Sequence, residues 1–201
     1  PEYEATHDNP DKDPYMAFEK DFMRFMLSDG AGAVLVQDYP EGACPLKIEW
    51  VDMTSYANEL PTCMFMASEL QEDGRLKSWK EFSPNEIKER AVLVGKQDIR
   101  QLKKHIIKYW VDHIETILAK HHIKAEEIDY IIPHVSSMFF YEKLNDEIAA
   151  RNIALTKEKW FTNLTSVGNI GSAAIYVALE ELIRTKEIKR GQKILLLVPE
   201  S

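Results

Sequence analysis

The sequence has few cysteines and few glycines, and it contains no long apolar run: of its 201 residues, two are Cys and eight are Gly. Cys44 and Cys63 have no Cys-x-x-Cys spacing and no histidine near them, so neither a zinc site nor a disulfide framework is expected. No apolar run approaches the roughly 20 residues that span a bilayer. The opening residues also lack the basic and apolar regions of a signal peptide. We therefore expect a cytoplasmic protein with no bound metal and no membrane partner.

Concentrated positive charge is also missing. The formal net charge is -8 and the isoelectric point is near 5.3, which argues against nucleic acid as a partner because phosphate binding relies on clustered Lys and Arg. The basic stretch at residues 96–105 is better interpreted as a solvated helix face than as an anion site. With 45% hydrophobic residues, the chain can bury a core as one domain or as a compact pair of subdomains.

The first half of the chain shows mixed patterns. A short helix is expected over residues 15–27, followed by β-rich segments over 28–37 and 46–55, where Leu46, Ile48 and Trp50 alternate on one face. Ser83, followed by proline and, three residues on, by Glu86, predicts a helix start. The clearest helix is predicted over 98–121, because apolar residues recur every three or four positions: Ile99, Leu102, Ile106, Tyr109, His113 and Ile117.

The second half alternates predicted strands and helices. Strands are expected over 129–133, 161–166 and 193–198. A helix is expected over 136–152, and a second one carries Ile175, Ala178, Leu179 and Leu182 on its apolar face. This order predicts a layered α/β arrangement.

Two polar residues follow predicted strands where a helix begins, which is where ligands and catalytic groups collect in open α/β sheets. His134 ends the strand at 129–133, and Asn169 stands between Gly168 and the next helix, with Gly171 just beyond. The glycines allow a tight turn and close approach of a substrate. Hydrogen bonds from both side chains to one oxygen would stabilise negative charge there. The alternatives are structural: His134 as a helix cap or the partner of a buried carbonyl, and Asn169 as a cap beside turn glycines.

Several sequence motifs together resemble those of a known enzyme family. The stretches "LSDGAGAVLV", "IDYIIPHVSS", "WFTNLTSVGNIGSAAIYVALEEL" and "KRGQKILLLVPES" resemble, in the same order, the later part of β-ketoacyl-acyl-carrier-protein synthase III enzymes, which are members of the thiolase-like superfamily. The resemblance runs from about Phe25 to the last residue. More narrowly, the sequence resembles the branch associated with aryl-polyene, flexirubin or dialkylresorcinol products.

The resemblance implies a thiolase-like layered α/β/α fold, of which this chain holds the C-terminal half and a remnant of the N-terminal half. Residues 1–40 would end the N-terminal half, and residues 41–201 would form the C-terminal condensing domain, cut short at its end. It also implies an acyltransferase that joins an acyl thioester to a malonyl-type donor, with His134 and Asn169 as catalytic residues. The implied substrates are coenzyme A or phosphopantetheine thioesters with no bound cofactor. The implied partners are acyl carrier protein and, at full length, a second copy in a homodimer.

The sequence departs from the family pattern in three ways. Ser137 replaces an asparagine expected near the pantetheine arm, and Phe139 replaces a frequent arginine. These two positions, with Gly168 and Gly171, are the predicted substrate-binding residues. The family's nucleophilic cysteine precedes the DGAGA word, whereas Cys44 and Cys63 follow it and are interpreted as structural. We therefore expect a C-terminal fragment that cannot complete a condensation by itself.

Two other functions remain open. The first is a non-catalytic partner subunit that kept the fold, although such a subunit has no chemical need for His134 and Asn169. The second is a hydrolase that uses Ser136 or Ser137 with His134. The short sequence separation places those serines poorly for the imidazole, and no Gly-x-Ser-x-Gly elbow is present.

Overall fold

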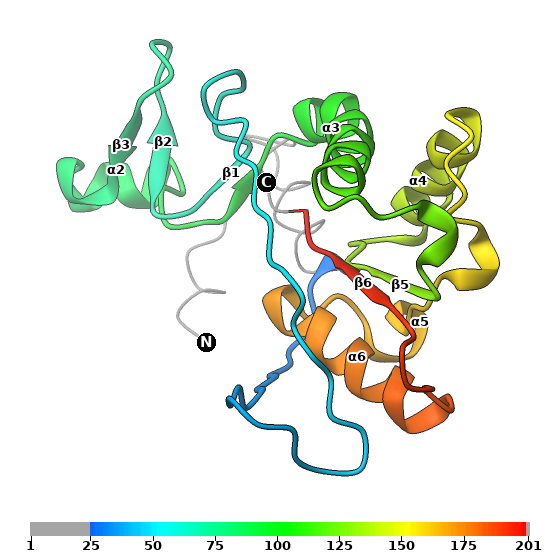
Figure 1. Ribbon diagram of the computed structural model, residues 1–201. Coiled ribbons are helices and arrows are strands. Elements are labelled where there is room, and N and C mark those ends of the chain that lie inside the picture. The colour runs from blue at the N-terminus through cyan, green and yellow to red at the C-terminus, as the bar shows by residue number, and fades with distance from the viewer. Residues whose placement is uncertain (1–24, 200–201) are drawn as a thin grey trace. The chain divides into compact units, whose positions relative to one another are not determined.

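The computed structural model describes residues 25–199, and these residues divide into two compact units (Figure 1). One unit contains Phe25 and residues 55–104, and the other contains residues 26–54 and 105–199. Helix α3 (Ile99–Lys120) starts in the first unit and continues in the second. Most of the helix expected over 15–27, and the greater part of the segment expected to end the N-terminal half, lie outside the described residues. The domain boundary near residue 40 stays a prediction about the complete fold.

The unit of residues 55–104 is built from two small antiparallel pairs. Strand β1 (Met64–Phe65) pairs with β4 (Lys96–Gln97), and β2 (Ser68–Leu70) pairs with β3 (Leu76–Ser78). A 3-10 turn, η1 (Trp79–Glu81), follows β3 directly.

The short helix of this unit begins where the sequence predicts. Helix α2 (Pro84–Glu89) has Ser83 as its N-cap and proline in its first turn. The backbone N–H of Ser83 donates to Glu86 Oε2 at 2.8 Å, and the backbone N–H of Glu86 donates to Ser83 Oγ at 3.4 Å. This reciprocal capping box satisfies two N–H groups that would otherwise lack partners at the helix start.

The second unit has a parallel pair of strands with helices on both faces. Strand β5 (Tyr130–Pro133) pairs in parallel with β6 (Ile194–Leu197), with Ile131 opposite Leu195. Helices α4 (Met138–Ala150) and α6 (Ala174–Thr185) lie between the two strands in sequence. A parallel pair requires such a crossover connection. The predicted α/β class and the strands and helices predicted around His134 are confirmed.

Neighbouring isoleucines of β5 bury opposite faces of the sheet. Ile131 belongs to a large core with residues of α3, α4 and β6, whereas Ile132 belongs to a second core with Ile175, Ala178 and Leu182 of α6. Alternate strand residues point to opposite faces, so a strand buried on both sides needs apolar side chains at successive positions. The run of isoleucines in β5 meets that need, and the result is a layer of α3 and α4, the sheet, and a layer of α6.

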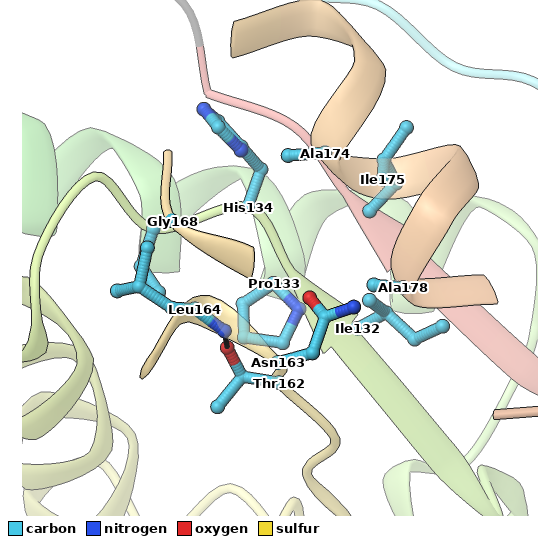
Figure 2. Close-up of a pocket in the computed structure, with 11 residues that line it drawn as sticks. Ile132, Pro133, His134, Thr162, Asn163, Leu164, Gly168, Ala174, Ile175 and Ala178 are labelled. Carbon is cyan, nitrogen blue, oxygen red and sulfur yellow. Dashed lines mark hydrogen bonds between the residues drawn. The ribbon is translucent and has the colours of Figure 1, made fainter. Parts of the chain in front are cut away.

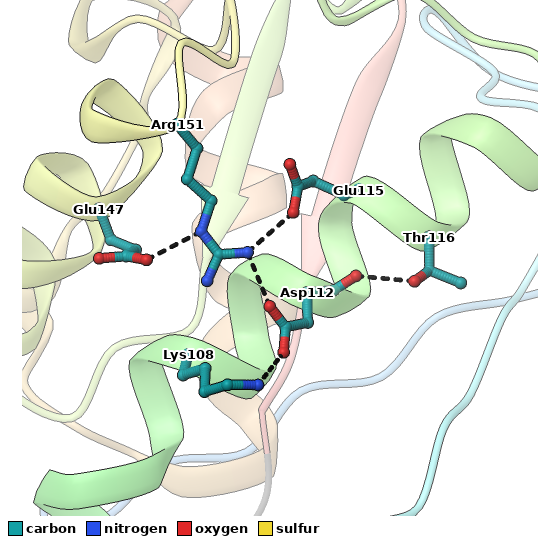
Figure 3. Close-up of polar contacts among 6 residues, drawn as sticks. All are labelled: Lys108, Asp112, Glu115, Thr116, Glu147 and Arg151. Atoms are coloured by element: carbon teal, nitrogen blue, oxygen red, sulfur yellow. Dashed lines mark hydrogen bonds and ion pairs between the residues drawn. The ribbon is translucent and has the colours of Figure 1, made fainter.

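An arginine at the end of α4 links that helix to α3 (Figure 3). Arg151 donates to Asp112 at 2.6 Å, to Glu115 at 2.8 Å and to Glu147 at 2.8 Å. Lys108 completes the network through Asp112. The three carboxylates raise the pKa of the Arg151 guanidinium above its ordinary value, with the hydrogen bond to Asp112 as the largest cause. The network fixes the helix layer on one side of the sheet.

Three predicted strands are wrong. Within the described residues, 28–37 and 46–55 form no strand, and several of their side chains are exposed, including Leu35 at 84% and Ile48 at 62%. A strand requires ladder hydrogen bonds from a neighbouring strand, and neither segment has one in the described part of the chain. Of the strand expected over 161–166, residues 164–166 belong instead to a short helix that ends at Val167. An isolated parallel bridge between Ile131 and Trp160 lies just before the expected strand.

The helix predicted over 98–121 is confirmed as α3, but most residues of its expected apolar stripe are only half-buried. The buried residues are Trp110, Val111, Ile114, Ile117 and Leu118, so only Ile117 belongs to the expected set. Apolar residues recur at helical spacing on two overlapping stripes of this helix, and periodicity cannot rank them. Packing against β5, β6 and α4 decides which stripe is buried.

Candidate active site

His134 follows β5 directly and stands at the carboxyl end of the parallel pair. Its backbone N–H donates to the carbonyl of Leu197 at 2.8 Å, which extends the β5–β6 ladder by one step. This bond holds the backbone of His134 to the sheet while its side chain leaves the sheet edge. The side chain is half-buried. The position is the one that open α/β sheets use for ligands.

A small pocket lies beside His134 (Figure 2). Its volume is about 20 Å³, which holds one water molecule or a single substrate oxygen but no acyl chain. Three elements contribute to its wall, namely the end of β5, the turn around α5 (Leu164–Val167) and the first turns of α6. The lining residues are Ile132, Pro133, His134, Val135, Thr162, Asn163, Leu164, Gly168, Ala174, Ile175 and Ala178.

The turn opposite His134 is organised by Asn163. The backbone carbonyl of Asn163 accepts hydrogen bonds from Ser166 N at 3.0 Å and Val167 N at 2.9 Å, which start α5. The amide of its side chain donates to Glu181 Oε2 on α6 at 2.7 Å. Asn163 is 9% exposed, so this hydrogen bond satisfies a polar group that would be costly to bury without a partner.

Asn169 follows Gly168 at the end of α5. Its side chain is buried, and its Oδ1 accepts a hydrogen bond from Gly171 N at 3.2 Å. That bond fixes the amide orientation, so the Nδ2 end is the donor. Gly168 has φ of +85° and Gly171 has φ of +59°, in the left-handed region that favours glycine. Gly168 lines the pocket with His134, whereas Asn169 and Gly171 lie next to it in sequence without lining it.

The DGAGA word packs against this same turn. Ser28 N donates to the carbonyl of Asn169 at 2.8 Å. A Cβ on Gly30 would come within 2.7 Å of the side chain of Ile170, and a Cβ on Gly32 would come within 3.0 Å of Tyr176. Such close approaches leave no room for larger residues. The glycines of this motif therefore let residues 28–32 run close to the turn that carries Asn169 and to the first turn of α6.

The other predicted substrate-binding residues lie at the start of α4. Ser137 is the N-cap of that helix, with extended backbone angles and no side-chain capping hydrogen bond. Phe139 is 46% exposed, and its ring lies edge to face with Phe140 at 5.3 Å. Neither residue is among those that line the pocket. Their predicted contact with a pantetheine arm stays a prediction.

Neither cysteine lies at this pocket. Cys63 is buried, its thiol donates to the carbonyl of Asp98 at 3.3 Å, and burial raises its pKa above the ordinary value. A raised pKa disfavours the thiolate that a nucleophile needs.

In the described part of the chain, no cluster of His, Cys, Asp and Glu is suited to hold a metal ion. No helix between residues 25 and 199 is both long and apolar enough to cross a membrane.

Sequence patterns did not identify Thr162, Asn163 and Glu181 as site residues. The Thr162 hydroxyl accepts a hydrogen bond from Leu164 N at 3.3 Å, drawn in Figure 2, at the entry to α5. Asn163 and Glu181 are 18 residues apart, and their hydrogen bond depends on how α6 packs against the turn. The signal that could have revealed Asn163 is an asparagine before a short Leu-Thr-Ser-Val stretch, which is a helix-start pattern.

The fold and the site together define an α/β protein. It has a parallel pair of strands covered by helices, a histidine at the carboxyl edge of that pair, and a Gly-Asn turn beside the same pocket. Residues 118–198 match the family model described as the C-terminal domain of 3-oxoacyl-[acyl-carrier-protein] synthase III. Those residues are similar to the C-terminal portion of β-ketoacyl-acyl-carrier-protein synthase III enzymes.

Curated relatives carry the same family name. The chain is 29% identical over 171 residues to β-ketoacyl-[acyl-carrier-protein] synthase III of Clostridium perfringens strain ATCC 13124, covering 85% of this chain and 47% of that protein. It is 31% identical over 97 residues to the synthase III of Clostridium acetobutylicum, covering 48% of this chain and 28% of that protein. The chain therefore spans less than half the length of these relatives.

A solved structure gives a partial match. The 3-oxoacyl-(acyl carrier protein) synthase III of Pseudomonas aeruginosa PAO1 aligns with 69% of this chain and 39% of its own, at 17% identity and a TM-score of 0.49.

Proposed function

We propose that the complete protein containing this chain is a 3-oxoacyl-acyl-carrier-protein synthase III-type acyltransferase, in which His134 and Asn169 stabilise the enolate formed from a malonyl-type thioester. The observation that supports the proposal is that the segments holding His134 and Asn169 meet at one edge of the sheet. His134 leaves the end of β5 beside a pocket that Gly168 also lines, and Asn169 follows that glycine with its amide held by Gly171.

The chemistry follows from two hydrogen-bond donors at one oxygen. When the malonyl carbon–carbon bond breaks, carbon dioxide leaves and its electron pair is delocalised onto the thioester oxygen. Ring N–H and amide N–H donors aimed at that oxygen stabilise the negative charge as it develops. The α-carbon then attacks an acyl-cysteine carbonyl, the new carbon–carbon bond forms, and the carbon–sulfur bond breaks to release the thiolate.

The nucleophile for this reaction would come from a part of the protein outside this chain. The raised pKa of Cys63 and the hydrogen bond from its thiol to the carbonyl of Asp98 support a structural role for that residue. A cysteine at a strand-to-helix junction upstream of the DGAGA word in the complete coding sequence is the expected result. Its absence would rule out the condensing enzyme and favour a non-catalytic partner subunit.

The substrates we propose are acyl and malonyl thioesters on coenzyme A or acyl carrier protein, used in the cytoplasm by a homodimer with no bound cofactor. Ser137 and Phe139 would face the pantetheine arm. The narrower link to aryl-polyene, flexirubin or dialkylresorcinol products remains a prediction from the sequence.

The test is malonyl decarboxylation by the complete protein, measured as release of carbon dioxide from malonyl-acyl carrier protein. His134→Ala and Asn169→Ala should each lower the rate by about 100-fold or more, since each removes a donor from the developing charge. Transfer of an acyl group to the nucleophile should remain measurable. His122→Asn is the matched control, because His122 is exposed in a left-handed turn that asparagine tolerates. Wild-type decarboxylation in both site variants would refute the assigned roles.

A further inference from the structure

The hydrogen bond between Asn163 and Glu181 links the two elements that surround the candidate site. Asn163 begins the turn at α5, and Glu181 lies on α6 beyond the buried face that packs on β5. The amide of Asn163 also lines the pocket beside His134 (Figure 2). Both side chains are at least partly buried, which protects their 2.7 Å contact from competition with water.

The helical turn that follows Asn163 is too short to be stable without contacts to other elements. Helix α5 contains four residues, and a helix of that length gains too few hydrogen bonds to offset the cost of starting it. It ends with Gly168 N donating to the carbonyl of Leu164 at 2.9 Å, and the next residue is Asn169. The position of Asn169 therefore depends on the contacts that fix the two ends of this turn.

Each end of the turn has a specific attachment. Ser28 N holds the carbonyl of Asn169 at the far end, and Glu181 holds the side chain of Asn163 at the near end. Glu181 belongs to a helix whose buried residues are packed in the core under β5, so it is a rigid anchor. Removing the near attachment would free the start of the turn while leaving the sheet and α6 intact.

We propose that Glu181 is a positioning residue: through Asn163 it fixes the α5 turn that carries Asn169 toward the substrate oxygen. The consequence for catalysis rests on the proposed function. A displacement of about 1 Å at a catalytic group can lower a rate by as much as about 100-fold. Glu181 itself touches no substrate in this proposal, and its effect is transmitted by one hydrogen bond.

The pair offers a matched set of variants in the complete protein. Glu181→Ala removes the acceptor, and malonyl decarboxylation should fall by about 10-fold or more in kcat, with KM changed by less than about 3-fold. Glu181→Gln keeps an acceptor oxygen and should remain within about 3-fold of wild type. Asn163→Asp places two carboxylates in contact and should be as impaired as Glu181→Ala.

The decisive variant combines Asn163→Asp with Glu181→Gln. This exchange reverses the hydrogen bond, because the amide now donates from α6 to a carboxylate on the turn, and activity should return to within about 3-fold of wild type. Each rate is corrected for the folded fraction measured by thermal unfolding, because loss of folded protein alone would also lower kcat. The proposal is overturned if Glu181→Ala keeps wild-type decarboxylation, or if its loss accompanies general unfolding that the double variant does not correct.

A second measurement does not depend on the reaction. Amide hydrogen exchange of residues 164–171 should be about 10-fold faster or more in Glu181→Ala and should return toward wild type in the double variant. If His134→Ala and Asn169→Ala decarboxylate normally, the proposed function fails. The exchange rates then decide the positioning role by themselves, and unchanged exchange in Glu181→Ala refutes it.

Discussion

The indole ring of Trp50 stacks on the imidazole of His121, with ring centroids 4.2 Å apart and an interplanar angle of 6°. The contact fastens the extended segment 50–54 to the last turns of α3. Asp52 adds an ion pair to Lys120 and a hydrogen bond with His121, each at 2.8 Å, and Thr54 Oγ1 lies 3.1 Å from His113 Nδ1. A segment without strand partners is thereby held by side chains instead of by a backbone ladder.

The Asp52 contacts predict an acid-dependent loss of stability. The hydrogen bonds from Lys120 and His121 lower the pKa of Asp52 from 3.8 to about 2. A folded-state pKa below the unfolded value means that the charged carboxylate stabilises the fold above about pH 4, and that this contribution is lost as the pH falls toward about 2. Asp52→Asn should therefore be less stable than wild type near neutral pH, and the difference should shrink over that interval.

The measurement is urea unfolding of both proteins at several pH values, followed by tryptophan fluorescence, which also reports the Trp50 stack. Asp38→Asn serves as the control, because Asp38 is exposed on another part of the chain. A difference between Asp52→Asn and wild type that stays constant from about pH 5 to pH 2 would contradict the assigned contacts of Asp52.

Arg151 should contribute more to stability than an ordinary surface cation. It contacts three carboxylates from two helices, and its side chain is 24% exposed. Arg151→Met should lower the free energy of unfolding by about 1–2 kcal/mol, since it leaves three carboxylates close together without their shared partner. Lys108→Met is the control, because Lys108 is 63% exposed and makes a single ion pair, so its loss should change stability far less.

Salt distinguishes this network from simple packing. Charge interactions near the surface weaken as salt screens them, so about 1 M sodium chloride should reduce the effect of Arg151→Met. Urea unfolding with and without salt measures both quantities. If the two variants cost the same, Arg151 acts as a single surface pair and not as the centre of a network.

A side chain at Gly168 should destabilise the fold for two separable reasons. Its φ is +85°, and a Cβ there would lie 2.4 Å from Ser28 Oγ. Gly74 has a similar φ of +81° with no heavy atom of the described residues within 4 Å of such a Cβ. Gly74→Ala should cost about 1 kcal/mol from backbone strain, whereas Gly168→Ala should cost about 2 kcal/mol or more.

The excess cost of Gly168→Ala should fall when the clash is removed. Combining it with Ser28→Gly deletes the hydroxyl and Cβ that the new methyl group would meet, so stability should return toward the Gly74→Ala level. Thermal unfolding of the three variants gives the comparison. Equal costs for Gly168→Ala and Gly74→Ala would show that Ser28 does not pack closely enough against this turn to clash with a methyl group at position 168.

Local patterns predicted the elements that flank the candidate site. The isoleucine run before His134 predicted β5, the serine, proline and glutamate at 83–86 predicted the capped start of α2, and the spacing of Ile175, Ala178 and Leu182 predicted the buried face of α6. Each of these signals depends on residues within a few positions of one another, and each is expressed locally.

Longer-range relationships were mispredicted or missed. The segments at 28–37 and 46–55 carry strand-like sequences but find no ladder in the described residues, because pairing depends on a partner that local sequence does not supply. The same limit explains α3, where two stripes compete and contacts with other elements choose between them.

The sequence by itself determined the α/β order, the place of His134 at a strand end and the resemblance to condensing enzymes, since these depend on residue type and short spacing. Only the tertiary structure decided that the DGAGA glycines run against the Asn169 turn and that Glu181 reaches Asn163. Both contacts join residues far apart in the chain, and close packing of the folded backbone brings them together.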